Sequence, residues 1–326
     1  MVAALSVLAA ACSDPSAFGP ADEAAQEVAG PTILADPAGL SAPTTESLPT
    51  LPPLPAAPPP ADPVTVHAVG NLGRCNADMI GVANAVAADT GLIFALGDLS
   101  TNGSQASIDE CFLNTFGSDL DRIYAVPGDQ DLVTDEGAAF YDMVAQTPTG
   151  SAPGDGWFVT SMGGWQIIGL NSRCHDVGCD TDSAQFQWLV DVLRNQPAEC
   201  RAVIWHDARF SSAFKVIDAK AMGPILGRLS SAGTDVLITG SPRSYERLGP
   251  SKPNGQLTVD DERGITHFNV GGGSVVGFDW APHVSSQDRI DANGYARFVF
   301  SPEGYTWEFV DTSDGNGEAD GGAGTC

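Results

Sequence analysis

Along the middle of the chain, short apolar runs alternate with longer polar segments. Five of these runs stop abruptly at a polar cluster, within residues 64–71, 92–98, 123–131, 203–207 and 236–243. A short apolar run bounded in this way is typical of a buried strand, and strands of this kind present functional side chains at their carboxyl ends. The segments between the runs are long enough for helices. The pattern therefore predicts an α/β layered fold with a crevice at the carboxyl ends of its strands.

Helical spacing predicts one helix within this framework. Asp182 and Ser183 are candidates for its N-cap, because short polar side chains accept hydrogen bonds from the first free backbone N–H groups of a helix. Apolar residues then recur at intervals of three and four positions, at Phe186, Leu189, Val190 and Leu193. We expect these side chains to pack in the core.

The polar residues after the five apolar runs form a set of acids with one imidazole. They are Asp98, Asp129, Asp131, His206 and Asp207. Carboxylate oxygens and imidazole nitrogens bind divalent metal ions, and bound metal ions assist phosphate chemistry. The set predicts a metal site. A serine hydrolase is disfavoured, because the chain contains no Gly-x-Ser-x-Gly motif.

Short motifs around these residues resemble those of the metallophosphoesterases, in particular the purple acid phosphatase and calcineurin-like branch. In order, they are Gly70-Asn71-Leu72-Gly73 for Gly-Asp-x-Gly, Gly97-Asp98-Leu99-Ser100-Thr101 for Gly-Asp-x-x-Tyr, Gly128-Asp129-Gln130-Asp131 for Gly-Asn-His-Asp/Glu, Val203-Ile204-Trp205-His206 for Val-x-x-His, and Gly240-Ser241-Pro242-Arg243 for Gly-His-x-His. The ordered set is far more specific than any single Gly-Asp pair. The resemblance implies a layered α/β/β/α sandwich with a two-metal centre at the carboxyl ends of its strands.

At the first metal of the family, this chain keeps only one ligand. The family uses its first Asp, a bridging Asp, a Tyr and the second His of Gly-His-x-His, and the corresponding residues here are Asn71, Asp98, Thr101 and Arg243. Only the bridging carboxylate, Asp98, remains. A two-metal hydrolase needs both ions to activate water and to clamp the attacking and leaving oxygens. The resemblance therefore implies a degenerate centre.

The second half of the centre is largely kept. The family's bridging Asp, Asn, His and first His of Gly-His-x-His correspond here to Asp98, Asp129, His206 and Ser241. We expect this set to bind at most one divalent ion, Mn²⁺, Zn²⁺ or Ca²⁺, or none. The family's general acid, a His, is replaced by Gln130, which cannot donate a proton near neutral pH. Loss of acid assistance commonly lowers the rate by a factor of about 10² to 10⁴.

Arg243 has two interpretations. Its guanidinium could lie close to Asp98 and replace part of the charge of the lost ion. Alternatively, it could point to solvent from a loop that has drifted. The sequence leaves both open.

Charge excludes one class of partner. The 326 residues include 15 Lys plus Arg and 41 Asp plus Glu, which gives a net charge of −26. Such a charge repels nucleic acids and anionic lipids at long range. We expect no nucleic-acid partner, and solubility is the simplest reason for the acidity.

The two ends of the chain indicate export and flexible segments. Residues 1–12 resemble a bacterial lipoprotein signal ending at Cys12, although no Lys or Arg precedes the apolar run, which leaves open a start upstream of Met1. Residues 13–62 are rich in Pro and Ala and predict a disordered linker. We expect the phosphoesterase-like domain at 63–310 and an acidic, Gly-rich, flexible tail at 311–326. Membrane contact is expected only through a lipid anchor on Cys12.

Cysteine usage agrees with export, to the cell envelope as a lipoprotein or to the medium. Besides Cys12 there are six cysteines, an even number that suits an oxidising compartment: Cys75, Cys111, Cys174, Cys179, Cys200 and Cys326. A Cys75–Cys111 disulfide is the first choice, because both residues follow strands that are expected to be neighbours. For Cys174 and Cys179, a loop-closing disulfide is favoured over metal binding. We expect Cys326 to pair with whichever of Cys174, Cys179 and Cys200 remains.

Two functional classes follow. The first is a protein with little or no catalysis that binds a small phosphorylated or anionic ligand, or a protein of the cell envelope. It is favoured by the substitutions at Asn71, Gln130, Ser241 and Arg243. The alternative is an active single-metal phosphoesterase, favoured by the retained Asp98, Asp129 and His206. The expectation is that catalysis is impaired.

Overall fold

The computed structural model describes residues 61–150, 154–213, 219–258, 263–277, 279–313 and 319–326. The predicted signal at 1–12 and nearly all of the predicted linker at 13–62 lie outside these residues. None of the described helices combines the length and the apolar character that crossing a bilayer requires.

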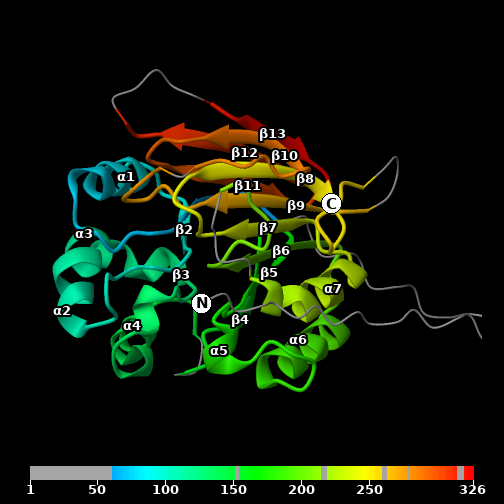
Figure 1. Cartoon of the computed structure of the whole chain (residues 1–326), viewed down its shortest axis with the longest axis horizontal. Helices are drawn as coiled ribbons and strands as arrows, with labels where there is room; N and C mark the ends of the chain where they lie inside the picture. Colours follow the sequence, from blue (N-terminus) through cyan, green and yellow to red (C-terminus); the bar gives the residue numbers. More distant parts are fainter. Residues whose placement is uncertain (1–60, 151–153, 214–218, 259–262, 278, 314–318) are drawn as a thin grey trace, which may run out of the picture. The chain divides into compact units, whose positions relative to one another are not determined.

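Two sheets form the centre of the domain (Figure 1). The six-stranded sheet has the order β13-β12-β11-β1-β2-β3, and its strands in chain order are Val64–Val69, Leu92–Ala95, Ile123–Ala125, Gly294–Ser301, Gly304–Asp311 and Gly321–Gly324. The seven-stranded sheet has the order β10-β8-β9-β7-β6-β5-β4. Its strands, β4 to β10 in chain order, are Phe158–Met162, Trp165–Gly169, Cys200–Trp205, Val236–Thr239, Tyr245–Ser251, Ile265–Val270 and Ser286–Ile290.

In each sheet, parallel strands bring the predicted polar ends to one edge. In the first sheet β1, β2 and β3 are parallel, with Val66 opposite Leu92 and Ile93 opposite Ile123. In the second sheet β5, β6, β7 and β9 are parallel. The carboxyl ends of parallel neighbours lie at the same edge of a sheet, which is where ligands bind in open α/β folds. Each of the five apolar runs identified in the sequence overlaps one of these parallel strands.

The main core lies between the two sheets. It is rich in fully buried aromatic side chains from both, including Phe94 and Phe298 of the first sheet and Trp165 and Phe268 of the second. The rings of Phe268 and Phe298 meet edge to face at 5.1 Å across this layer. Both sheets contribute apolar side chains to this one core, so they belong to a single folding unit.

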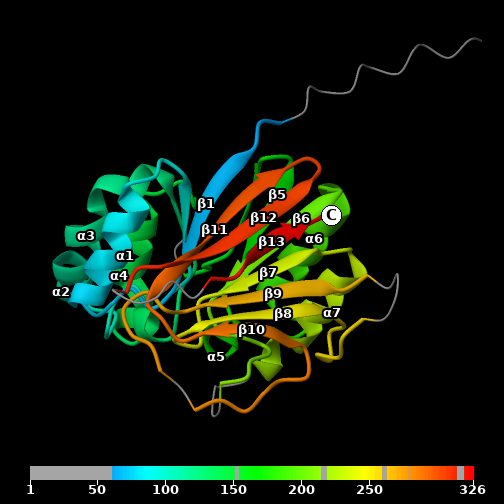
Figure 2. The same cartoon turned by 90° about the horizontal axis from the view of Figure 1, so that it is seen from above.

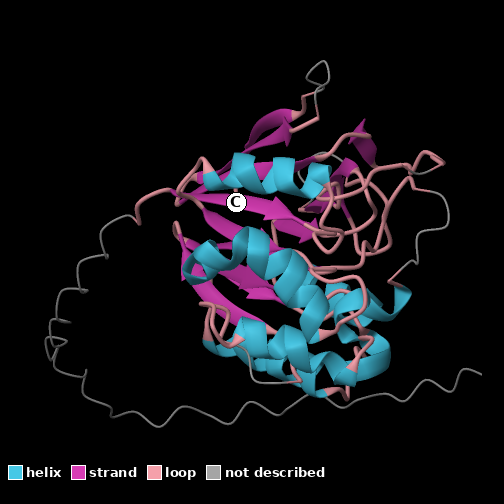
Figure 3. Cartoon of the chain, turned by 90° about the vertical axis from the view of Figure 1, so that its left-hand side faces the viewer, coloured by secondary structure: helices cyan, strands magenta, loops and turns pink. Residues whose placement is uncertain are grey.

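Helices cover the outer faces of both sheets (Figures 2 and 3). The first sheet is covered by α1 and by a group of short helices that are joined end to end, and the second by α5, α6 and α7. The first set comprises α1 Ala77–Ala87, α2 Gln105–Ser107, η1 Ile108–Leu113, α3 Asn114–Phe116, η2 Gly117–Arg122, η3 Gln130–Leu132, η4 Asp135–Gly137 and α4 Ala138–Val144. The second comprises α5 Cys174–Val177, α6 Ala184–Asn195, η5 Lys220–Met222 and α7 Gly223–Ser231. The predicted α/β/β/α layering is confirmed.

Helix α6 begins where the sequence predicted. Ser183 is its N-cap, and the Ser183 side chain accepts a hydrogen bond from the Phe186 N–H. Leu189 and Leu193 are buried as expected, but the third buried apolar residue is Val192, whereas Val190 is half-buried. The buried face is therefore rotated slightly from the predicted one.

The interpretation of residues 311–326 as a flexible tail does not fit the described part of that segment. Strand β13 pairs antiparallel with β12, with Glu308 opposite Gly321 and Tyr305 opposite Gly324. The buried Asp320 carboxylate accepts hydrogen bonds from Tyr245, at 2.6 Å, from Arg247, at 2.7 and 2.9 Å, and from the Trp307 indole, at 3.2 Å. Composition suggested flexibility because Gly-rich acidic segments rarely pack, whereas here the sheet edge and one carboxylate hold the segment in place.

Three disulfides join the six cysteines, as Cys75–Cys111, Cys174–Cys179 and Cys200–Cys326. The first is the predicted pair, although Cys111 lies in η1 rather than directly after a strand. The second closes a six-residue loop around α5. The third ties the end of the described chain to the first residue of β6.

Candidate metal centre and anion pocket

Three of the predicted metal ligands come together in the structure. Asp98 follows β2, Asp129 follows β3 and His206 follows β6, and one ligand atom from each lies within 4.8 Å of the others. The Nε2 atom of His206 is 3.6 Å from the Asp98 carboxylate and 3.9 Å from the Asp129 carboxylate. Two carboxylates and an imidazole at this separation fit a single divalent ion.

The His206 ring is oriented by the backbone. Its Nδ1 lies 2.7 Å from the Leu96 carbonyl oxygen and donates to it, so Nε2 faces the two carboxylates. A hydrogen bond of this kind fixes the ring in the orientation that a metal ligand needs. Burial lowers the pKa of His206, but the carboxylates of Asp98 and Asp207 outweigh burial and raise the pKa to about 9. The same carboxylates that favour a proton on Nε2 of His206 would also favour a metal cation at this position.

Asp98 and Asp131 have different roles. Asp98 lies in a left-handed turn, with φ 55°, and its carboxylate accepts a hydrogen bond from the Gln130 N–H at 3.0 Å. Burial, with the nearby Asp129 carboxylate, raises the pKa of Asp98. Asp131 is fully buried and accepts backbone hydrogen bonds from Leu99 at 2.8 Å and from Gly128 at 2.9 Å. Asp131 therefore braces the loops that carry Asp98 and Asp129, and burial together with the Asp98 charge raises its pKa to about 7.

Asp207 turns away from the cluster. Its carboxylate accepts a hydrogen bond from the Ser172 hydroxyl at 2.8 Å, and its N–H donates to the same hydroxyl oxygen at 3.0 Å. Of the five polar residues that the sequence placed in the crevice, the structure brings Asp98, Asp129 and His206 together. Asp131 and Asp207 support the surrounding loops.

Asn71 acts as a cross-link between strand ends. Its side-chain amide donates to the carbonyl oxygens of Gly240, at 2.9 Å, and Gly271, at 2.8 Å. Asn71 thereby ties the end of β1 to the ends of β7 and β9. Both hydrogens of the Asn71 amide are used in these two bonds. At the first metal position the chain therefore has a hydrogen-bond donor in place of a carboxylate ligand.

The other substituted positions also offer no metal ligand set. The Thr101 hydroxyl lies 3.3 Å from the Ser107 hydroxyl on an exposed loop. The Ser241 hydroxyl accepts a hydrogen bond from the Ala208 N–H at 3.2 Å, and the Ser241 N–H donates to the His206 carbonyl at 3.0 Å. Ser241 thus supports the loop that carries His206.

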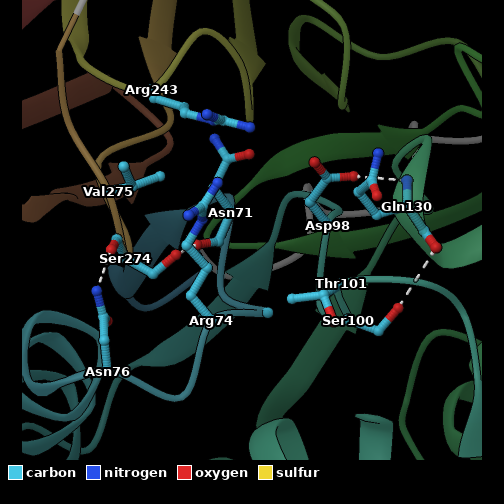
Figure 4. Close-up of a pocket in the computed structure, with 11 residues that line it drawn as sticks. Asn71, Arg74, Asn76, Asp98, Ser100, Thr101, Gln130, Arg243, Ser274 and Val275 are labelled. Carbon is cyan, nitrogen blue, oxygen red and sulfur yellow. Dashed lines mark hydrogen bonds between the residues drawn. The ribbon is translucent and has the colours of Figure 1, made fainter.

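A pocket of about 500 Å³ opens beside Asp98 (Figure 4). Asp98, Thr101 and Gln130 lie on one side of it in this view, and Arg74 and Arg243 lie on the other with Asn71. Among the described residues, neither arginine forms an ion pair, and both side chains are exposed. Arg243 forms no ion pair with Asp98 among the described residues, and its exposed side chain lines the same pocket as Asp98.

Arg74 is the pocket residue that the sequence analysis missed. It lies in the loop between β1 and α1, two residues before Asn76, the N-cap of α1. Its position in the sequence was the available signal. Arg74 follows a site motif and comes just before the start of a helix, and the N-terminus of a helix favours anion binding.

No protein-family model matches the chain, and no curated protein sequence matches it. Solved structures do resemble it. A purple acid phosphatase from yellow lupin (Lupinus luteus) seeds aligns over 80% of this chain with a TM-score of 0.68 and 16% identity, and the chain spans 54% of that protein. GAP50, described as the anchor in the inner membrane complex of Plasmodium, aligns over 81% of this chain and 89% of its own length, with a TM-score of 0.62 and 14% identity. PhoD aligns over 84% of this chain and 70% of its own length, with a TM-score of 0.55 and 12% identity.

These similarities agree with the layered architecture of the two sheets and their covering helices. At 12 to 16% identity these similarities show the fold alone. The chemistry of the site has to be inferred from the residues of this chain. The domain therefore has the fold of the calcineurin-like metallophosphoesterases, as the ordered motifs of the sequence predicted.

Proposed function

We propose that this chain binds a small phosphorylated or otherwise anionic ligand in the pocket beside Asp98, and that it hydrolyses phosphate esters poorly. The observation that carries the proposal is that two guanidinium groups, those of Arg74 and Arg243, lie on one side of that pocket and form no ion pair with any described residue. Guanidinium groups bind phosphate oxygens through charge-assisted hydrogen bonds, often in pairs.

The surroundings of the two arginines also favour an anion. The chain has only 15 Lys plus Arg against 41 Asp plus Glu, so two cations that line one pocket reverse the local charge. The 11-residue helix α1 begins at the pocket, and its N-cap Asn76 is one of the lining residues. A helix N-terminus adds partial positive charge and free N–H groups. The pocket therefore offers donors on one side and the Asp98 carboxylate on the other.

Two features support weak catalysis. The Gln130 side chain donates to the Asp129 carboxylate at 2.7 Å, and an amide cannot protonate a leaving alkoxide. The Asn71 amide faces two carbonyl oxygens, so in the described part of the chain the half-site nearest the arginines has no anionic ligand apart from Asp98. A pair of ions that clamps the attacking and leaving oxygens therefore has no second set of ligands.

The second candidate function is that of a single-metal phosphoesterase. It is favoured by the approach of Asp98, Asp129 and His206 to within 4.8 Å of one another. An ion bound there would act as a Lewis acid toward a phosphoryl oxygen or a water molecule. In this chain Asp98, Asp129 and His206 would hold the ion, and Arg74 and Arg243 would hold the ester.

The test compares binding with turnover for one probe, 4-nitrophenyl phosphate. In binding assays without metal, Arg74→Gln and Arg243→Gln should each weaken binding about tenfold, the loss of one charge-assisted hydrogen bond. Arg194→Gln is a matched control, because Arg194 is an exposed arginine of α6 outside the pocket. Unchanged binding in the double variant Arg74→Gln/Arg243→Gln would overturn the anion-site proposal. Rapid metal-dependent release of nitrophenol that is lost in His206→Ala would favour the second candidate.

We further propose that the protein is exported and held at the cell envelope through Cys12, or secreted. The three disulfides support an oxidising compartment. Cys12 itself lies outside the described residues. A cell-envelope protein remains the other candidate partner for the same pocket, and nucleic acid is disfavoured by the net charge of −26.

A further inference from the structure

The pocket beside Asp98 is larger than the anionic group that its two arginines would hold. Its volume is about 500 Å³. Sites that enclose a whole small molecule usually have roughly 300–1,000 Å³. A phosphate group has few atoms and fills the space of a few water molecules, roughly 100 Å³. With phosphate between Arg74 and Arg243, most of the pocket is left for the alcohol part of an ester.

The side of the pocket opposite the arginines carries a free carboxylate oxygen. One oxygen of Asp98 is already used, because it accepts the Gln130 N–H at 3.0 Å and lies 3.6 Å from Nε2 of His206. Among the described residues, no donor reaches the other oxygen of Asp98. In Figure 4 that oxygen points away from Gln130, toward the open centre of the pocket. It is therefore placed to accept a hydrogen bond from a ligand.

Two neutral polar groups lie on the same side of the pocket as Asp98. The Gln130 amide nitrogen donates to the Asp129 carboxylate at 2.7 Å, which leaves the Gln130 amide oxygen as an acceptor. The exposed Thr101 hydroxyl can both donate and accept. Of the described residues that line the pocket, only Asp98 carries a carboxylate. One carboxylate beside neutral acceptors suits alcohol hydroxyl groups better than an ammonium group.

We propose that the ligand of this pocket is a phosphate ester of a polyhydroxy alcohol, that is, a polyol phosphate or a sugar phosphate; this inference rests on the anion site proposed above. The phosphate group binds to Arg74 and Arg243. Hydroxyl groups of the alcohol donate to the free oxygen of Asp98 and to the amide oxygen of Gln130. A simple alkyl phosphate would leave these acceptors against an apolar chain, and a site built for hydroxyl groups discriminates against such an analogue.

The same chemistry occurs in a soluble polyol phosphate and in the glycerol headgroup of a phospholipid. The net charge of −26 repels an anionic membrane surface. A soluble ester is therefore the expected source.

The test is calorimetric titration of the full chain, in the presence of a chelator, with inorganic phosphate, n-propyl phosphate and glycerol 3-phosphate. The two esters have the same three-carbon chain and differ in two hydroxyl groups. We expect glycerol 3-phosphate to bind about tenfold more tightly than propyl phosphate. Equal affinities for the two esters would overturn the polyol assignment and leave the anion site standing, whereas no binding of any probe would overturn both.

Two further probes test the alternatives. Phosphoethanolamine has an ammonium group where glycerol 3-phosphate has hydroxyl groups, and tighter binding of phosphoethanolamine would overturn the assignment of hydroxyl donors. Vesicles that contain phosphatidylglycerol present the same headgroup on a membrane. Retention of the protein on these vesicles, without binding of glycerol 3-phosphate, would overturn the choice of a soluble ester.

The variant Asp98→Asn separates recognition of the alcohol from a general effect on the pocket. Asparagine keeps an oxygen for the Gln130 N–H, replaces the free oxygen with a donor and removes a negative charge beside the anion. Propyl phosphate should therefore bind roughly twofold to fivefold more tightly than it binds to the unmodified protein, because charge repulsion is lost. The preference for glycerol 3-phosphate over propyl phosphate should disappear.

A disturbed pocket would instead weaken both esters alike. Asp142→Asn is the matched control, because Asp142 is an exposed residue of α4 outside the pocket, and it should change neither affinity. A preference for glycerol 3-phosphate that persists in Asp98→Asn would show that Asp98 does not bind the hydroxyl groups and would overturn the proposal.

Discussion

Replacing Asn71 by Asp restores the residue that the metallophosphoesterases have at this position, and we predict that it destabilises this protein. The Asn71 amide gives one hydrogen to the Gly240 carbonyl and the other to the Gly271 carbonyl. A carboxylate has no hydrogen to give and would face both carbonyl oxygens. Asn71 is only 7% exposed, so water cannot readily replace the lost donors.

The magnitude follows from the two hydrogen bonds. Each buried acceptor that loses its donor costs about 1–3 kcal/mol, so Asn71→Asp should lower the free energy of unfolding by about 2–6 kcal/mol. For a domain of this size, 1 kcal/mol corresponds to about 2–4 °C in Tm, which predicts a decrease of about 5–20 °C. Thermal unfolding followed by circular dichroism in the presence of a chelator measures this change.

Two comparison variants separate the causes. Asn71→Ala removes both donors without adding a charge, so Asn71→Asp should be the less stable of the two if repulsion contributes. Asn102→Asp is a matched control, because Asn102 is exposed and its side-chain oxygen only accepts, from the Ser104 N–H and hydroxyl. We expect little change there. A Tm for Asn71→Asp equal to that of the unmodified protein would refute the cross-linking role of Asn71.

Two further predictions concern metal binding and pH. Titration with Mn²⁺ or Zn²⁺ should give at most one ion per chain, and His206→Ala should abolish binding, because the described centre has only the Asp98, Asp129 and His206 ligand set; two tightly bound ions per chain would contradict this. Burial raises the pKa of Asp320, but the Arg247 guanidinium and the Tyr245 hydroxyl outweigh burial and hold that pKa below its usual value. Asp320 therefore stabilises the fold above the unfolded pKa of about 4 and loses this effect as pH falls through the folded pKa. Unfolding curves should place Asp320→Asn below the unmodified protein at pH 7, with the difference shrinking under acidic conditions; a constant difference at every pH would show that the charge does not matter.

Much of the fold could be predicted because the strands that carry the site are short, apolar and parallel. The apolar run that ends at Asp98 contains β2, and the run that begins at Val203 covers the second half of β6. Both strands give apolar runs because they are buried on two faces. The antiparallel strands β11 and β12 were not predicted, because alternating residues such as Ala296, Arg297 and Phe298 give a weak signal without knowledge of the partner strand.

The site was predictable only in part, because the sequence does not show in which direction each side chain points. Motif order identified Asp98, Asp129 and His206, but it could not show that the Asn71 amide points at two carbonyl groups or that Asp207 turns to Ser172. Arg74 was missed because it lies one residue beyond the Gly70-Asn71-Leu72-Gly73 motif and corresponds to no motif position itself. Side-chain direction depends on contacts between segments far apart in the sequence, and these are not encoded in local patterns.

Strand β13 has a consequence for aggregation. Without it, β12 would be the edge of the first sheet, with Trp307 and the unpaired backbone groups of residues 305–308 available to another chain. An exposed edge with aromatic residues is a template for intermolecular pairing, and proteins commonly cover such edges. Here the cover is four residues from a segment rich in glycine, held by Asp320 and by the Cys200–Cys326 disulfide. Reducing agents would therefore weaken the protection of this edge while leaving the strands of the metal centre paired.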